Sequence, residues 1–183
     1  DTRAGRQLRR TANGVSEVAA CKYANWRTAP LAGPLAVNGV ATVTAWSATA
    51  GFQTGQTGSL TVYLRDFDPG TAVYTEITNA TLTQAGWQGA SNTWVQKSIA
   101  LPSVSYTLAT GHQLELKVVA PNASALNMLI AYDTTASFGG FLLQQLLNAF
   151  AAGAGMGAAI LLIAAAAEPL YRGAMLRAAL RCE

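Results

Sequence analysis

The sequence predicts a mainly β protein, an antiparallel β-sandwich of the jelly-roll or Ig-like type, followed by one C-terminal transmembrane α-helix and a short amphipathic helix. Two observations predict the sandwich: runs that alternate with period 2 fill residues 37–132, and turn sequences such as "TGQTG", "DPG" and "AGWQG" recur about every 10–15 residues. A third observation predicts the helix, because no charged residue occurs between Asp133 and Glu168. No helix-length amphipathic run separates the strands, which argues against a parallel βαβ fold.

Each expected strand has one apolar face and one polar face. The runs are "VATVTAWSAT" (40–49), "SLTVYLRDF" (59–67), "TAVYTEITNATLTQ" (71–84), "TWVQKSIAL" (93–101), "HQLELKVVA" (112–120) and "NMLIAYDTT" (127–135). We expect Trp46, Trp87 and Trp94 to be core or rim aromatics. If Trp87 and Trp94 of "GWQGASNTW" are instead exposed, they form a ligand-binding face.

The segment before these strands, residues 1–34, is basic and rich in proline and glycine toward its end. It is predicted to be an extended arm whose Arg3, Arg6, Arg9 and Arg10 contact a partner or lipid headgroups, with a disordered terminus as the alternative. The expected organisation is therefore an arm at 1–34, a β-sandwich ectodomain at 35–136, a transmembrane helix at 137–168 and a cytoplasmic amphipathic tail at 169–183.

The charge-free run from Leu142 to Ala167 is 26 residues long, enough to cross a hydrocarbon core of about 30 Å. Its centre is made of small residues. Gly153 and Gly157 are expected helix-packing positions, since small side chains let helix backbones approach closely in lipid. Leu161 lies one turn further along the same face and is the third expected packing position. The alternative is a buried hairpin or core helix of a soluble domain. The run contains no ionisable side chain and is thus expected to anchor and pack rather than to conduct ions or hold a redox centre.

The tail carries Arg172, Arg177 and Arg181, which are predicted to contact headgroups or a partner. The positive-inside rule places them in the cytoplasm and the β-domain in the periplasm or outside the cell. The two cysteines, Cys21 and Cys182, flank the apolar run, and a membrane-spanning run would keep them apart within one chain. No disulfide framework is therefore expected.

No catalytic motif is present. His112 lies in "ATGHQLEL" without a serine elbow or paired cysteine, and is expected to be a turn or strand-edge residue. Asp66, Asp68 and Asp133 are candidates for a calcium site, and the alternative is that "DPG" is ordinary turn chemistry. We expect no enzyme activity, no cofactor, no resident metal and no nucleic-acid partner.

The stretch "YTLATGHQLELKVVAPNASALNMLIAYDTT" (106–135) resembles the terminal part of β-sandwich modules of bacterial exported proteins, in which a "Y-x-L-x-x-G-H-x-L-x-L" strand precedes a closing "A-Y-D-T" strand. The whole arrangement resembles an accessory subunit of a bacterial membrane complex, such as a photosynthetic reaction-centre or light-harvesting assembly. The resemblance implies a single-pass, non-catalytic subunit of the bacterial inner membrane, whose transmembrane helix and arm contact other subunits and the lipid bilayer. The alternative is a membrane-tethered module that binds carbohydrate or protein.

Overall fold

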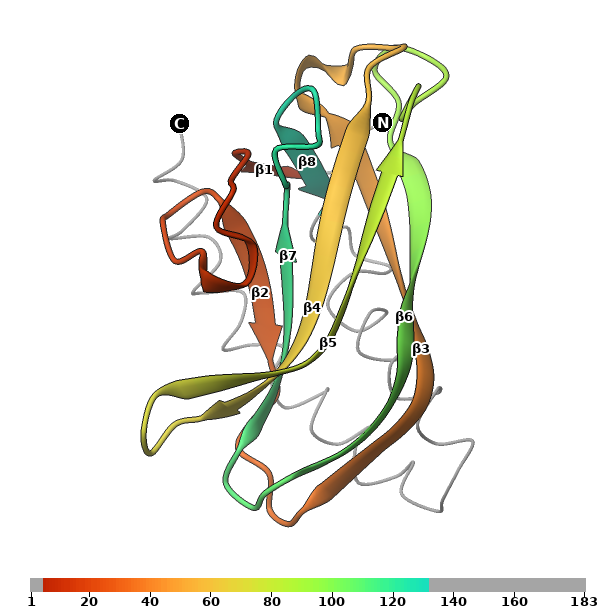
Figure 1. The fold of residues 1–183 in the computed structure, drawn as a ribbon. Coiled ribbons are helices and arrows are strands. Elements are labelled where there is room, and N and C mark those ends of the chain that lie inside the picture. The colour runs from red at the N-terminus through yellow and green to blue at the C-terminus, as the bar shows by residue number, and fades with distance from the viewer. Residues whose placement is uncertain (1–4, 132–183) are drawn as a thin grey trace.

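The computed structural model of the chain describes residues 5–131, which form two antiparallel sheets packed face to face (Figure 1). The first sheet has the strand order β1 (Gly5–Leu8), β8 (Met128–Ala131), β3 (Leu35–Thr49) and β6 (Val95–Leu108). The second sheet has the order β2 (Tyr23–Arg27), β7 (Gln113–Val119), β4 (Gly58–Asp68) and β5 (Val73–Gln84). Two short 3-10 turns, η1 (Gly14–Ser16) and η2 (Ala50–Phe52), interrupt the connections.

This strand order is that of an eight-stranded jelly roll, in which the chain passes repeatedly from one sheet to the other. The predicted antiparallel β-sandwich is confirmed, and the order distinguishes between the two sandwich types that the sequence left open. Order and register depend on pairings between strands that are distant in sequence, for example β1 with β8 and β2 with β7.

The core lies between the sheets and follows from the period-2 alternation. Leu60, Val62 and Leu64 of β4 are at most 1% exposed and face inward, where they join a cluster that includes Val37 of β3 and Leu101 of β6. Burial of such side chains contributes about 1.5–3 kcal/mol each relative to exposure. The polar residues between them, which face the other way, make the outer face of the second sheet.

Pro102 lies within β6 although proline cannot donate a ladder hydrogen bond. Strand β6 is at the edge of its sheet, and its register against β3 shifts between Gly39 and Ala41, so that two residues of β6 oppose one of β3. Proline is tolerated in sheets at edges and bulges. The bulge thus accounts for a strand that passes through this position without a break.

The prediction of an extended arm over residues 1–34 is wrong for the described part of that segment. β1 pairs with β8 and β2 pairs with β7, so the segment supplies an edge strand to each sheet (Figure 1). The prolines and glycines that suggested an arm occupy only the connection from β2 to β3. Alternation in the short strand "YANWR", where Ala24 and Trp26 are buried, was too brief to stand out. The sandwich therefore begins at Gly5, not near residue 35.

The predicted transmembrane helix at 137–168 and tail at 169–183 lie outside the described residues, as do Gly153, Gly157, Leu161, Arg172, Arg177 and Arg181. Within residues 5–131, no helix has the length and apolar character needed to cross a bilayer. Cys21 is buried and disulfide-bonded, whereas the sequence predicts no disulfide framework. Cys182, the other cysteine of the sequence, also lies outside the described residues.

Candidate functional site

The outer face of the second sheet carries a row of charges that alternate in sign. The register pairs Glu115 of β7 with Arg27 of β2 on one side and with Arg65 of β4 on the other. Arg65 in turn lies opposite Glu76 of β5. Side chains directly opposite one another on one face of an antiparallel pair have Cβ atoms about 4.5–5.5 Å apart, so neighbours of opposite charge attract. Four strands therefore contribute one charge each to a single row.

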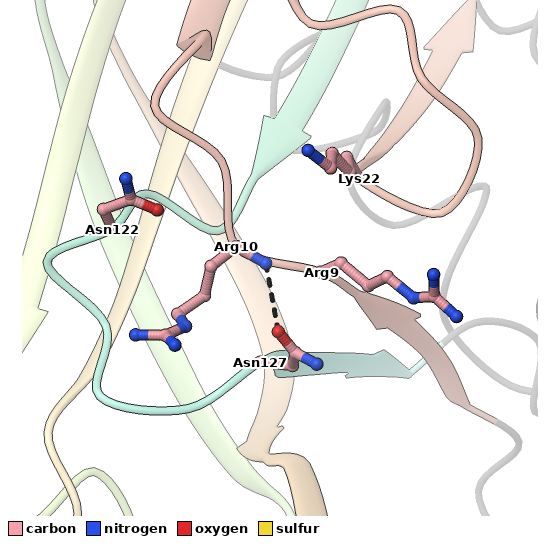
Figure 2. A pocket seen from close by; sticks show the side chains of 5 residues that line it. All are labelled: Arg9, Arg10, Lys22, Asn122 and Asn127. Carbon is pink, nitrogen blue, oxygen red and sulfur yellow. Dashed lines mark hydrogen bonds between the residues drawn. The ribbon is translucent and has the colours of Figure 1, made fainter.

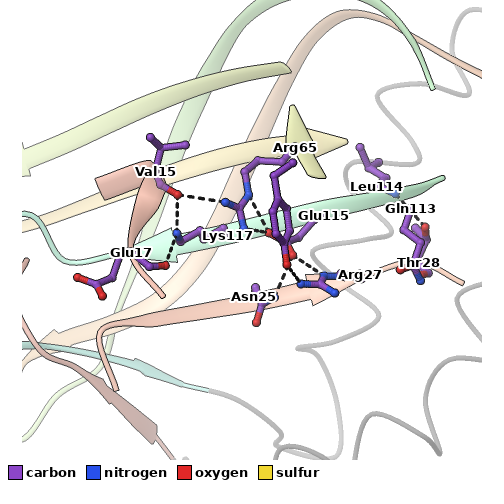
Figure 3. Close-up of polar contacts among 11 residues, drawn as sticks. Val15, Glu17, Asn25, Arg27, Thr28, Arg65, Gln113, Leu114, Glu115 and Lys117 are labelled. Carbon is purple, nitrogen blue, oxygen red and sulfur yellow. Dashed lines mark hydrogen bonds and ion pairs between the residues drawn. The ribbon is translucent and has the colours of Figure 1, made fainter. Parts of the chain in front are cut away.

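Glu115 is the centre of this row, and its carboxylate is fully buried. Its Oε1 accepts hydrogen bonds from Arg65, through Nη2 and, at 2.8 Å, through Nε. Its Oε2 accepts from Arg27 Nε at 2.5 Å and from Asn25 Nδ2 at 3.0 Å (Figure 3). A buried carboxylate is tolerated only when it is paired and hydrogen-bonded. Here the pairing also orients both guanidinium groups.

Residues 9–22, which connect β1 to β2 and are called the N-terminal loop here, cross over this face. Lys117 Nζ donates to the main-chain oxygens of Val15 at 2.7 Å and Glu17 at 2.6 Å, and Arg65 Nη1 donates to Val15 at 3.1 Å (Figure 3). Burial, assisted by the nearby Arg65 charge, lowers the pKa of Lys117 to about 8. Two buried cations thus hold the loop on the sheet through its carbonyl groups.

The N-terminal loop is itself ordered by Glu17. Its carboxylate accepts from the hydroxyl of Thr11 and, at 2.7 Å, from the backbone N–H of Ala19, and the Thr11 hydrogen bond is the largest of the effects that lower the pKa of Glu17. Gly14 has a φ of +37°, and a Cβ at this position would lie 2.6 Å from the hydroxyl oxygen of Tyr63. Glycine is therefore required for the loop to approach the sheet this closely.

Aromatic rings lie beside the two arginines of the row. The Arg27 guanidinium lies 4.1 Å from the centre of the Phe67 ring, and that of Arg65 lies 4.2 Å from the centre of the Tyr74 ring. Arg27 Nη2 also donates to the Tyr74 hydroxyl. Cation–π contacts of this kind contribute about 0.5–1 kcal/mol at exposed sites. They hold Tyr74, which is 39% exposed, against the charged row.

A pocket of about 490 Å³, called the outer-face pocket here, lies between the N-terminal loop and the charged row. It is lined by Val15, Ser16, Glu17, Val18, Tyr23, Asn25, Arg27, Arg65, Tyr74 and Glu76. The lining combines hydroxyl, amide, carboxylate and guanidinium groups with tyrosine rings. Sites of this kind place a few polar groups around an aromatic or apolar surface, an arrangement typical of small-ligand recognition.

A second pocket of about 490 Å³, called the basic pocket here, lies on the other side of the N-terminal loop, where the loop meets the connection from β7 to β8. It is lined by Arg9, Arg10, Lys22, Asn122 and Asn127 (Figure 2). The predicted contact residues Arg9 and Arg10 are thus both exposed and gathered at one site. Arg6 instead lies within β1, opposite Ile130, and Arg3 lies outside the described residues.

Asp66 and His112 meet at the end of β4, away from the outer-face pocket. His112 Nδ1 lies 2.8 Å from Asp66 Oδ1, and the Tyr106 hydroxyl donates to Asp66 Oδ2 at 2.9 Å. Burial and this hydrogen bond raise the pKa of Tyr106. Asp68 does not join the cluster; it accepts from the backbone N–H of Gly70 at 2.8 Å. The two aspartates therefore serve a ring contact and a turn, and Asp133 lies outside the described residues.

The interpretation of Trp87 and Trp94 as an exposed ligand face is wrong. Trp87 is 1% exposed and donates from Nε1 to Ser47 Oγ at 3.1 Å, and Trp94 is 7% exposed and packs edge-on against Phe52. Both are core residues, which was the other interpretation of their position. Burial removes the large apolar surfaces of both rings from water, which is more favourable than leaving the rings exposed.

Sequence reasoning did not identify the residues that line the outer-face pocket. A signal was present in the polar positions of the alternating strands, since "NWR", "LRDF" and "ELK" each place an arginine or a carboxylate on the face opposite the core. Which of these positions become neighbours depends on strand order and register, and neither follows from alternation alone.

No protein-family profile and no curated protein matches the chain. Solved structures do match. An aminopeptidase from a marine sediment archaeon (Thaumarchaeota archaeon) aligns with a TM-score of 0.50 and 16% identity, over 68% of this chain and 25% of its own. An α-amino acid ester hydrolase aligns with a TM-score of 0.51 and 14% identity, over 70% of this chain and 26% of its own. The match thus spans about a quarter of the length of these enzymes. At this identity the similarity concerns the fold alone, a β-sandwich shared with one part of larger hydrolases.

Proposed function

We propose that the described domain is a non-catalytic binding module whose outer-face pocket takes a neutral ligand rich in hydroxyl groups, that is, a saccharide. The observation that carries this proposal is the pairing within the charged row. The arginines beneath the pocket are held by Glu115, which leaves a polar surface with little unpaired charge.

The hydrogen-bonding groups at the pocket favour a neutral ligand over an anion. Arg65 already donates to Glu115 and to the Val15 carbonyl, and Arg27 donates to Glu115 and Tyr74. Within the described residues the open groups are of mixed kind: the Oδ1 of Asn25, the hydroxyl proton of Tyr74 and the second carboxylate oxygen of Glu76. Sugar hydroxyls both donate and accept, and so match such a set.

Tyr74 supplies the apolar part of the proposed site. Its ring is partly exposed at the pocket and is held against the guanidinium of Arg65, so little side-chain freedom is lost when a ligand packs on it. The exposed side chains of Val15 and Val18 on the N-terminal loop extend this surface. A pyranose ring has the same combination of apolar faces and polar rim.

Titration calorimetry of the full-length chain with oligosaccharides selected from a glycan array tests this proposal. Tyr74→Ala is expected to weaken binding about threefold to tenfold, because an aromatic contact of this size is removed. Val73→Ala is the matched control, since Val73 is the neighbouring residue of β5, is 55% exposed and does not line the pocket. No binding across the array, or equal effects of both substitutions, would refute the proposal.

A second candidate function, a structural subunit of a bacterial membrane complex, is favoured by the charge-free run from Leu142 to Ala167. Gly157→Leu is then expected to reduce the size of the particle extracted in mild detergent while membrane insertion is retained. Gly140→Leu, a substitution just before Leu142, is the control. A particle of unchanged size would argue against this function.

A further inference from the structure

The basic pocket contains donors and cations without a lining carboxylate. Arg9 and Arg10 are exposed, and Lys22 retains 36% exposure of its side chain. Arg10 Nη1 donates to the Ser124 carbonyl at 3.1 Å, which anchors the guanidinium while its other N–H groups remain able to donate. Three cations at one concave surface favour an anionic ligand.

The amide of Asn127 adds a further donor between these cations. The backbone N–H of Arg10 donates to Asn127 Oδ1 at 3.1 Å, and this hydrogen bond directs Nδ2 away from Arg10. Figure 2 shows Arg9 and Lys22 on one side of Asn127, and Arg10 and Asn122 on the other. The donors are thus spread along the pocket rather than gathered at a point, which suits an extended ligand.

The basic pocket and the outer-face pocket adjoin across the N-terminal loop. Lys22 lines the first and Glu17 lines the second, and Lys22 Nζ lies 4.0 Å from Glu17 Oε2. The next residue, Tyr23, already belongs to the outer-face pocket. A chain of a few sugar units is long enough to reach from one pocket to the other over this short stretch of loop.

We infer that the ligand is an acidic saccharide, with neutral sugar units in the outer-face pocket and a carboxylate or sulfate group in the basic pocket. This inference rests on the proposed function and adds the charge class of the saccharide. A carboxylate and a sulfate share the chemistry that matters here, oxygen acceptors with negative charge, and the experiment distinguishes them.

The test compares matched polymers on the full-length chain: dextran, carboxymethyl dextran and dextran sulfate of one length, and polygalacturonate with and without methyl esters. We expect the acidic member of each pair to bind more tightly. Arg9→Gln and Lys22→Gln are each expected to reduce that affinity about twofold to fivefold, as for other exposed ion pairs, and to leave the neutral member unaffected. Raising the salt concentration should reduce the difference between members of a pair. Lys97→Gln, a basic residue outside both pockets, is the control.

The outcomes separate this inference from the proposed function. Equal affinity for both members of every pair, with Tyr74→Ala still weakening both, would overturn the inference and leave the proposed function standing. If the binding of acidic polymers depends on Arg9 and Lys22 but not on Tyr74, the basic pocket binds them alone, contrary to the proposed function. Binding to phosphatidylglycerol vesicles that needs Arg9 and Lys22, without binding to any acidic saccharide, would overturn the inference in favour of a lipid headgroup.

Discussion

Replacement of Glu115 by glutamine is the sharpest test of the buried charge row. The substitution keeps the size of the side chain but removes the negative charge that faces Arg65 and Arg27. It also places an amide N–H₂ group where one carboxylate oxygen accepted a hydrogen bond. Arg65, with 8% of its side chain exposed, is then left as a buried cation close to Lys117.

The expected loss in the free energy of unfolding follows from the burial of Arg65. Breaking a buried ion pair by removing one partner costs about 3–5 kcal/mol, whereas a domain of this kind has a total free energy of unfolding of about 5–15 kcal/mol. The midpoint of thermal unfolding should fall by about 10–20 °C. Urea unfolding followed by circular dichroism at pH 7 measures the change in free energy, and the far-ultraviolet spectrum at low urea shows whether the variant still folds.

Two controls make the result interpretable. Glu76→Gln removes the charge at the exposed end of the same row and should change the free energy of unfolding by less than about 0.5 kcal/mol. The double variant Glu115→Leu with Arg65→Leu removes both charges of the buried Arg65–Glu115 pair, and should recover at least half of the stability lost in Glu115→Gln. A loss below about 1 kcal/mol for Glu115→Gln would show that the row does not hold the sheet face as argued.

Three further predictions concern other parts of the chain. The pKa of Lys117 is about 8 in the folded state, well below its ordinary value, so above pH 8 the unfolded chain binds more protons than the folded chain. The free energy of unfolding of the wild type should therefore rise by about 1.4 kcal/mol per pH unit between pH 8 and 9.5. Urea titrations of Lys117→Met should lack this slope. Gly58→Ala should destabilise by about 1–3 kcal/mol, since its Cβ would lie 2.4 Å from the Trp87 ring, whereas Gly89→Ala, with no atom within 4 Å, should be nearly neutral in the same assay. Cys21 should resist alkylation until it is reduced. Non-reducing electrophoresis then tests the membrane topology, because a spanning segment would keep Cys21 apart from Cys182 within one chain. A disulfide-linked dimer is compatible with a spanning segment, whereas a disulfide-bonded monomer would refute it.

The fold class was predictable because alternation is a local property. Each run from "VATVTAWSAT" to "HQLELKVVA" shows its apolar face within a few residues, and β3, β4, β6 and β7 lie where these runs predict. The N-terminal strands were missed because β1 and β2 are short edge strands whose stability comes from pairing with β8 and β7. The outer-face pocket was missed for a related reason, since Arg27 and Glu115 are 88 residues apart in sequence and meet only through register.

Local sequence patterns were enough to establish that this protein is built from antiparallel strands with a buried face. They also showed that one long C-terminal run has no charged residue, and that a basic cluster lies near each end of the sequence. The strand order, the choice between core and exposed positions for Trp87 and Trp94, and the assembly of four distant charges into one row beneath a loop were decided only in the folded molecule. This division arises because alternation specifies which face of a strand is apolar, whereas the neighbours of a polar side chain depend on which strands pair and in which register.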